Sequence, residues 1–239
     1  MTNTLSSDTR GILENMSTAT LATALFKAGF KNQFIQEVSP LHIHGKNMVG
    51  PAFTLRYIPA REDRNPIEAF KDPKHPQRVA VEACPSGSVM VIDSRKNARA
   101  ASAGSILVTR LMVKGATGIV TDGGFRDTSE IASLAFSSFQ HRASAPTNLT
   151  LHEALEFEVP IGCGDVAVFP GDIIVGDMDG VIVIPQDIVD EIAVEGNKMT
   201  AYENFVMEKV IEGAPIIGLY PLLDEDIKVE FEQWKENRK

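Results

Sequence analysis

The chain has 239 residues, of which 44% are hydrophobic, and its 32 acidic and 23 basic side chains give a net charge of −9. This composition is too apolar for a disordered chain, and no apolar run is long enough for a transmembrane helix, so we expect one globular domain that does not bind a membrane. The acidic balance argues against a nucleic-acid partner, because phosphate contacts need a basic face. The two cysteines exclude a disulfide scaffold. The first residues lack a secretory signal, so we expect a cytoplasmic protein.

The first hundred residues contain signals for a helix and two strands. A helix is predicted over 17–28, with Ser17 or Thr18 as its cap and Gly29 as its end. Strands are predicted over 48–58 and 89–93. Between them, residues 59–78 are rich in proline and charge, which predicts a surface excursion with a short helix at 67–70.

The remainder alternates helix and strand before it becomes all-β. The predicted helices cover 104–114 and 128–135, with a helix start at His152-Glu153, and the predicted strands cover 118–121, 136–141 and several segments of 159–184. A helix from Asp187 to about Gly213 and a polar tail follow. This order predicts an α/β fold with a mixed sheet.

The strongest chemical signal is the segment 115–127. A buried strand ends in the pair Gly123-Gly124, which lets the backbone turn sharply. The turn presents Arg126, a two-pronged donor for carboxylates, beside Asp127, a ligand type that Mg²⁺ and Mn²⁺ prefer. A surface ion pair on a loop is the competing interpretation.

A second signal is the predicted helix start near Gly104. Free backbone N–H groups and the helix dipole make such an end a seat for a carboxylate or phosphate, and Ser105 is placed to cap it. An ordinary capped helix would look the same. The nearby cations Arg95, Lys96 and Arg99 fit either an anion site or a solvated edge.

Four segments together resemble the RraA-like family, which includes 4-hydroxy-4-methyl-2-oxoglutarate aldolases and regulators of ribonuclease E activity. They are residues 17–25 with 48–52, residues 91–93 leading to Gly104, residues 115–127, and residues 170–185. The resemblance covers roughly 17–200 in the family's order. It implies one RraA-like domain over 1–239, with a core at about 17–200 and a C-terminal helical arm and tail at about 187–239.

The resemblance implies a swivelling β/α/β sandwich with a mixed sheet, assembled as a homotrimer or homohexamer with sites between subunits. It also implies a metal-dependent (class II) aldolase or oxaloacetate decarboxylase, a lyase that acts on a small anionic 2-oxo acid through a pyruvate-type enolate. By position, Asp127 would hold Mg²⁺ or Mn²⁺ and Arg126 would bind the keto oxygen. The substrate carboxylate would lie at Gly104, Ser105, Ile106 and Leu107. Glu203 would act from a neighbouring subunit.

The sequence departs from the aldolases of this family at Ser105. They carry an acidic residue twenty-one positions before the arginine, and a serine hydroxyl is a poor base. Standard aldolase activity, dehydratase or hydrolase chemistry on a sugar-derived oxo acid, and non-catalytic binding to an RNA-processing enzyme therefore all stay open. The long 59–78 segment is a further departure, which suits a different or more anionic substrate.

Overall fold

A curled mixed sheet of eight strands organises the chain. The computed structural model describes residues 5–42, 45–222 and 224–238. Seven strands lie in the order β1-β7-β5-β3-β2-β11-β12, and β8 also pairs with β2. Their bounds are β1 Ser39–His42, β2 Met48–Pro59, β3 Val89–Asp93, β5 Gly118–Thr121, β7 Ser137–Gln140, β8 His152–Phe157, β11 Ile173–Gly176 and β12 Val181–Ile184.

The long strand β2 joins the two halves of the sheet. On one side it pairs in parallel with β3, with Ala52 opposite Val89. On its other side it pairs antiparallel with β11 near its start and with β8 near its end. Strands β2, β3, β5 and β7 run parallel, so their carboxyl ends meet at one edge of the sheet.

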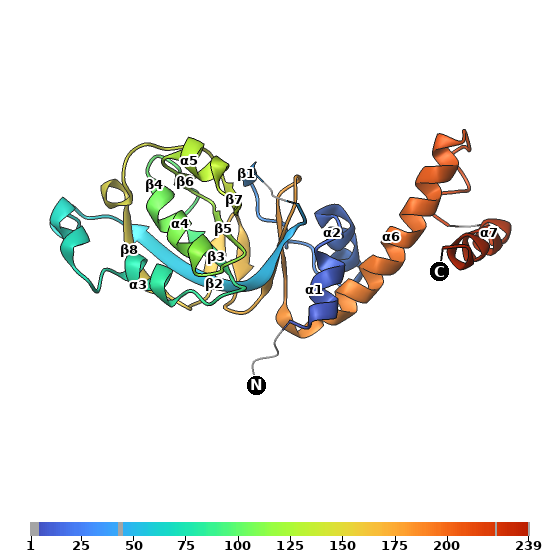
Figure 1. Cartoon of the computed structure of the whole chain (residues 1–239), viewed down its shortest axis with the longest axis horizontal. Coiled ribbons are helices and arrows are strands. Elements are labelled where there is room, and N and C mark those ends of the chain that lie inside the picture. The colour runs from blue at the N-terminus through green and yellow to red at the C-terminus, as the bar shows by residue number, and fades with distance from the viewer. Residues whose placement is uncertain (1–4, 43–44, 223, 239) are drawn as a thin grey trace.

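Helices cover one face of the parallel strands and a β-hairpin covers the other (Figure 1). The helices are α3 Pro76–Ala83, α4 Ser105–Val113 and α5 Thr128–Ser133. The buried Leu111 of α4 and Ile131 of α5 pack with Ile92 and Ile119 of the sheet. The hairpin of β9 Ile161–Cys163 and β10 Val166–Val168 buries its apolar side chains against the opposite face.

Three helices pack together beside β11 and β12. They are α1 Ser7–Leu13, α2 Thr18–Lys27 and α6 Val189–Ile211, and their buried apolar residues form one cluster with both strands. Ser17 caps α2 by accepting a hydrogen bond from the Thr20 N–H at 3.0 Å, which explains where that helix begins.

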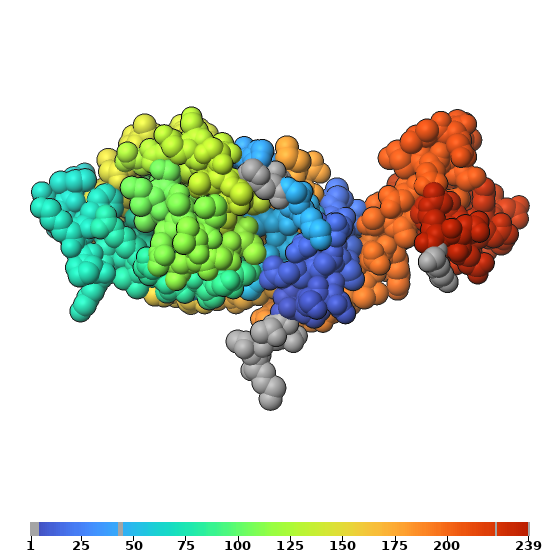
Figure 2. All heavy atoms as spheres, in the orientation of Figure 1, coloured from blue at the N-terminus to red at the C-terminus, as the bar shows by residue number. Residues whose placement is uncertain are grey.

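The far end of α6 projects from the body and carries α7 Glu225–Glu236 (Figures 1 and 2). Aromatic rings join the two helices: Phe205 on α6 lies 5.5 Å from Phe231 and 5.9 Å from Trp234, centroid to centroid. Phe205 is fully buried, so the arm has a small core of its own.

The predicted α/β fold with a mixed sheet is confirmed. Short 3₁₀ helices occur at Ile67–Lys71, as predicted, and at Asn148–Thr150 and Gln186–Ile188. Three predictions were wrong. One concerns the start of α4, where Gly104 rather than Ser105 is the cap residue and no side chain caps the helix. The segment at His152-Glu153 begins strand β8 rather than a helix, because it pairs with the edge of β2, and the polar tail contains the helix α7. Helix α3 was not predicted.

Candidate functional site

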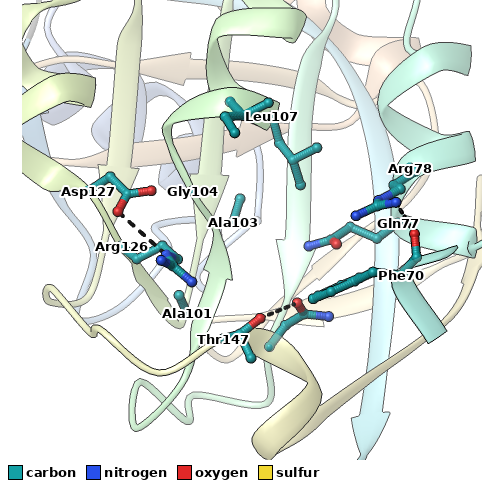
Figure 3. Close-up of a pocket in the computed structure, with 12 residues that line it drawn as sticks. Phe70, Gln77, Arg78, Ala101, Ala103, Gly104, Leu107, Arg126, Asp127 and Thr147 are labelled. Carbon is teal, nitrogen blue, oxygen red and sulfur yellow. Dashed lines mark hydrogen bonds and ion pairs between the residues drawn. The ribbon is translucent and has the colours of Figure 1, made fainter. Parts of the chain in front are cut away.

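A pocket of about 270 Å³ lies at the carboxyl edge of the parallel strands (Figure 3). It opens beside the short parallel pair β4 Ala101–Ala103 and β6 Gly124–Phe125, which follow β3 and β5 in the chain. This edge is where α/β sheets usually bind ligands. The volume is just below the roughly 300–1,000 Å³ of sites for drug-sized molecules, so the pocket suits a small metabolite.

The glycine turn after β5 is fixed by hydrogen bonds on both sides. The Gly123 N–H donates to Thr121 Oγ1 at 3.0 Å, and the Phe125 N–H donates to Gln140 Oε1 at 2.6 Å. The Arg126 N–H then donates to the Ala103 carbonyl oxygen at 3.1 Å. These bonds place Arg126 and Asp127 at the pocket wall.

Asp127 has a left-handed backbone, with φ at 58°, where it precedes α5. Its Oδ1 lies 3.4 Å from Arg126 Nε, and its Oδ2 lies 3.3 Å from Ser105 N and 3.4 Å from Ser105 Oγ. All three distances exceed the 2.7–2.9 Å typical of strong charge-assisted bonds, so the carboxylate keeps capacity for a further partner.

The amino end of α4 forms the adjoining wall. A Cβ at Gly104 would lie 2.8 Å from Asp127 Oδ2 and 2.9 Å from Arg126 Cγ, so any larger residue would have to displace one of these side chains. The Leu107 N–H already donates to the Gly104 carbonyl oxygen at 3.1 Å, and the Ser105 N–H points to Asp127. Among the described residues of this first turn, the N–H of Ile106 is therefore the one left without a hydrogen-bond acceptor.

The structure brings most of the predicted site residues together. The residues that line the pocket include Gly104, Ile106, Leu107, Arg126 and Asp127, and Ser105 Oγ lies 3.4 Å from Asp127 Oδ2.

Glu203 is not part of this pocket in its own chain. It lies on α6 and accepts a hydrogen bond from Thr20 Oγ1 at 3.0 Å. The cations Arg95, Lys96 and Arg99 do not line the pocket either, and Lys96 instead pairs with Asp165 at 2.7 Å.

The opposite wall of the pocket was not predicted from the sequence; it is formed by Phe70, Gln77, Arg78, Thr147 and Asn148. Gln77 is buried and its Nε2 donates to Tyr57 Oη at 2.9 Å and to the Ser102 carbonyl oxygen at 2.7 Å, which ties the start of α3 to the sheet edge. One signal was available: Pro76 occupies the first turn of α3, a position that favours a helix start.

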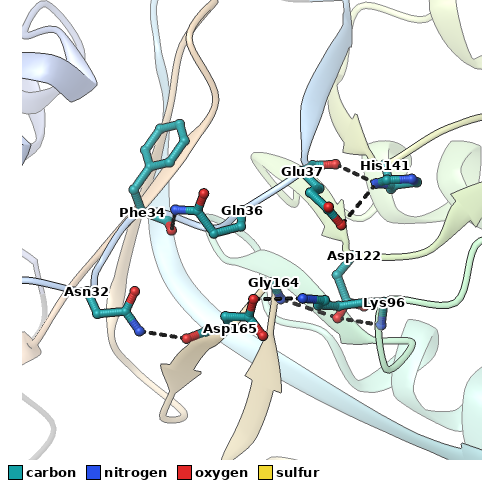
Figure 4. A network of polar contacts seen from close by, with 9 residues as sticks. All are labelled: Asn32, Phe34, Gln36, Glu37, Lys96, Asp122, His141, Gly164 and Asp165. Atoms are coloured by element: carbon teal, nitrogen blue, oxygen red, sulfur yellow. Dashed lines mark hydrogen bonds and ion pairs between the residues drawn. The ribbon is translucent and has the colours of Figure 1, made fainter.

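The buried Asp122, which directly follows β5, binds three loops together (Figure 4). It accepts hydrogen bonds from the N–H groups of Ser94 at 2.6 Å, Lys96 at 3.0 Å and Gly164 at 3.2 Å. Burial raises the pKa of Asp122 to about 6 despite these bonds, which favour the charged form. Asp122 thus fixes the loops that follow β3 and β9.

The described residues contain no cluster of three or more His, Cys, Asp or Glu side chains arranged to bind a metal. A metal at Asp127 would therefore have one carboxylate ligand from the pocket and would keep bound water. Mg²⁺ is commonly held in this way, so the residues present fit it. Across the described part of the chain, no helix has the length and hydropathy needed to cross a membrane.

Comparisons with known proteins agree with this architecture. A sequence profile described as RraA-like, Aldolase/RraA, matches residues 18–183. A Halalkalibacterium halodurans protein, provisionally named 4-hydroxy-4-methyl-2-oxoglutarate aldolase, is 32% identical over 168 residues, which cover 69% of this chain and 71% of that protein. An uncharacterized Methanocaldococcus jannaschii protein is 34% identical over 114 residues, which cover 46% of this chain and only 52% of that protein.

A solved structure from Streptomyces coelicolor also matches. It is described as an unusual member of the RNase ES inhibitor RraA protein family, and it is 25% identical with a TM-score of 0.75. The match covers 85% of this chain and 97% of that one. Profile, sequence relative and structure therefore agree that the chain belongs to the RraA-like family.

Proposed function

We propose that the protein is a lyase that breaks a carbon–carbon bond in a small 2-oxo acid. The observation that carries this proposal is the arrangement of Arg126 and Asp127 in one pocket with the amino end of α4. This arrangement combines a cation, a carboxylate and a free amide around a space for a small anion. The name of the Halalkalibacterium relative supports the same class of reaction.

The substrate carboxylate would bind at the amino end of α4. The Ile106 N–H would donate to it, and the helix dipole favours negative charge there. The Arg126 guanidinium would donate to the oxo oxygen and stabilise negative charge that develops on it in the transition state. A Mg²⁺ or Mn²⁺ ion held by Asp127 would supply Lewis-acid stabilisation of the same charge.

Ser105 favours decarboxylation over aldol cleavage. Aldol cleavage requires a base to remove the proton of the C4 hydroxyl, and a serine hydroxyl is a poor base. Decarboxylation of a 3-carboxy-2-oxo acid needs no such base. The bond from C3 to the departing carboxyl carbon breaks, its electron pair moves toward the C2 oxo group, and carbon dioxide leaves. A proton from water then adds to C3.

The glutamate on α6 completes the proposal. Because Glu203 lies outside the pocket of its own chain, it would serve a second copy of the chain in a homotrimer or homohexamer, beside that copy's Asp127. The assembly would then hold one such pocket at each contact between copies.

The test is turnover of oxaloacetate and of 4-hydroxy-2-oxo acids by the purified protein with Mn²⁺. Asp127→Ala should lower the rate at least ~100-fold, as expected for loss of a metal or of a charge-stabilising group. Ser105→Asp should raise aldol cleavage relative to decarboxylation. Wild-type protein that matches Asp127→Ala on every substrate would overturn the proposal and favour a non-catalytic regulator, the alternative suggested by the description of the Streptomyces relative.

A further inference from the structure

Three buried hydroxyl groups form a closed ring of hydrogen bonds next to the pocket. They belong to Ser94, which follows β3, to Ser102 of β4 and to Thr121, the last residue of β5, and none of these residues is exposed. The distances are 2.6 Å from Ser94 Oγ to Ser102 Oγ, 2.7 Å from Ser102 Oγ to Thr121 Oγ1, and 3.1 Å from Thr121 Oγ1 to Ser94 Oγ. Each hydroxyl can therefore donate one hydrogen bond and accept another within the ring.

The ring is joined directly to the turn that leads to Arg126. Thr121 Oγ1 also accepts a hydrogen bond from the Gly123 N–H at 3.0 Å. A Cβ at Gly123 would lie 2.6 Å from Ser102 Oγ and 2.6 Å from Ser94 Cβ, so the turn and the ring are in close contact. Loss of the Thr121 hydroxyl would leave the Gly123 N–H buried without its acceptor, which is costly and favours a shift of the turn.

Ser102 connects the ring to both walls of the pocket. Its neighbours Ala101 and Ala103 line the pocket (Figure 3), and because side chains alternate along a strand, the Ser102 hydroxyl points to the other side, toward the ring. The Ser102 carbonyl oxygen accepts a hydrogen bond from Gln77 Nε2 at 2.7 Å, and Gln77 belongs to the wall opposite Arg126. The ring therefore links the position of one wall to that of the other.

We infer that the three residues of this ring are positioning residues, whose hydroxyl groups hold Arg126 in the place from which it donates to the oxo oxygen. The inference rests on the proposed function in naming the oxo oxygen as the partner of Arg126. The ring acts through the glycine turn and takes no part in bond breaking. The carboxylate seat at the Ile106 N–H lies on α4, which has its own packing on the sheet. Loss of the ring therefore impairs bond breaking more than binding.

The experiment removes one hydroxyl and keeps the shape of the side chain. Thr121→Val does this, whereas Thr121→Ser keeps the hydroxyl. The matched control is Thr54→Val: Thr54 of β2 is equally buried and its hydroxyl also accepts a backbone N–H, that of Val159 at 3.1 Å, but Thr54 does not line the pocket. The readout is the Arg126 Nε–Hε signal in a ¹H–¹⁵N spectrum, assigned by its loss in Arg126→Lys.

Thr121→Val should shift the Arg126 signal, whereas Thr121→Ser and Thr54→Val should leave it at the wild-type position. With oxaloacetate and Mn²⁺, Thr121→Val should lower kcat at least ~10-fold and leave KM within about twofold, because a small misplacement of a charge-stabilising group affects mainly the transition state. Thr121→Ser should keep most of the wild-type kcat. If Thr121→Val does not fold, Ser94→Ala answers the same question, because it opens the ring, keeps the acceptor of the turn and should also shift the signal.

The inference would be overturned by an Arg126 signal that stays in place when the ring is opened, by an equal shift in Thr54→Val, or by failure of Thr121→Ser to keep the wild-type signal. A Thr121→Val variant with raised KM and unchanged kcat would overturn it as well. The spectra require no turnover. An inactive wild type would therefore reject the proposed function, and the shift of the Arg126 signal would still decide whether the ring positions this residue.

Discussion

The absence of a side chain at Gly104 lets the amino end of α4 lie directly against Arg126 and Asp127. A methyl group there would displace the carboxylate or the guanidinium stem, because both lie within 3 Å of the Cβ position. The pocket therefore depends on a residue that carries no chemistry of its own.

Gly104→Ala should lower the affinity for oxo acids at least ~10-fold. The added methyl group would shift Arg126 and the Ile106 N–H, the proposed partners of the oxo oxygen and the carboxylate, by some tenths of an ångström. Calorimetry with 2-oxoglutarate measures this. Gly11→Ala is the matched control: a Cβ at Gly11 meets nothing within 4 Å, and alanine inside α1 should stabilise the fold by up to ~1 kcal/mol. Wild-type affinity in Gly104→Ala would show that the close approach is unimportant for binding.

Asp122 makes stability depend on pH. Its pKa in the folded state, about 6, exceeds the ordinary value of 3.8, so the folded protein binds this proton more tightly than the unfolded chain. The stabilisation is fully present below pH 3.8 and is lost as pH rises through 6. A shift of about two units corresponds to ~3 kcal/mol.

Asp122→Asn removes this titration. Relative to the variant, wild type should lose up to ~3 kcal/mol of unfolding free energy between pH 4 and pH 7, measured by urea denaturation at several pH values. Asp122→Ala should be destabilised throughout, because three backbone N–H groups lose their acceptor. A constant difference between wild type and Asp122→Asn across this range would contradict the raised pKa.

At the scale of elements, α7 is attached to α6 by aromatic contacts that a single substitution can weaken. Trp234 is the sole tryptophan of the chain, and its Nε1 donates to Glu208 Oε2 at 2.8 Å. Phe231→Ala should release α7 and shift the Trp234 emission to longer wavelength, with little change in the unfolding of the sheet. Val229→Ala, at an exposed position of α7, should leave the emission unchanged. An unshifted spectrum in Phe231→Ala would mean that the other contacts suffice.

The elements also differ in how readily sequence predicts them. The Arg126-Asp127 turn was predictable because its strand, glycine pair and charged residues are contiguous. Helix α7 was missed because its charges outnumber its apolar residues, although Phe231 and Trp234 recur at helical spacing. Strand β8 was mistaken for a helix start because its pairing with β2 is a long-range contact that no local pattern encodes.

The same reason explains the part of the candidate site that was missed. Phe70 and Arg78 reach the pocket only because α3 packs on the sheet, roughly fifty residues before Arg126 in the chain. Asn148 comes from a separate loop. The composition of residues 59–78 predicts a surface excursion, and only the fold reveals that part of this segment borders the pocket.

For the whole molecule, the helical arm places Glu203 outside the pocket. Helix α6 has 23 residues and is therefore about 35 Å long. Glu203 lies on it and does not line the pocket of its own chain, so a contribution of Glu203 to a pocket would require an assembly of several copies.

Strand β2 has a consequence for the rigidity of the pocket. One continuous strand carries both halves of the sheet, so the halves have no flexible connection about which to rotate. By contrast, the 3₁₀ helix that bears Phe70 has no buried residue, so this wall of the pocket is less firmly packed than the sheet. Arg126 and Asp127 follow directly on strands of the rigid frame, so the two charged groups of the pocket share its fixed geometry.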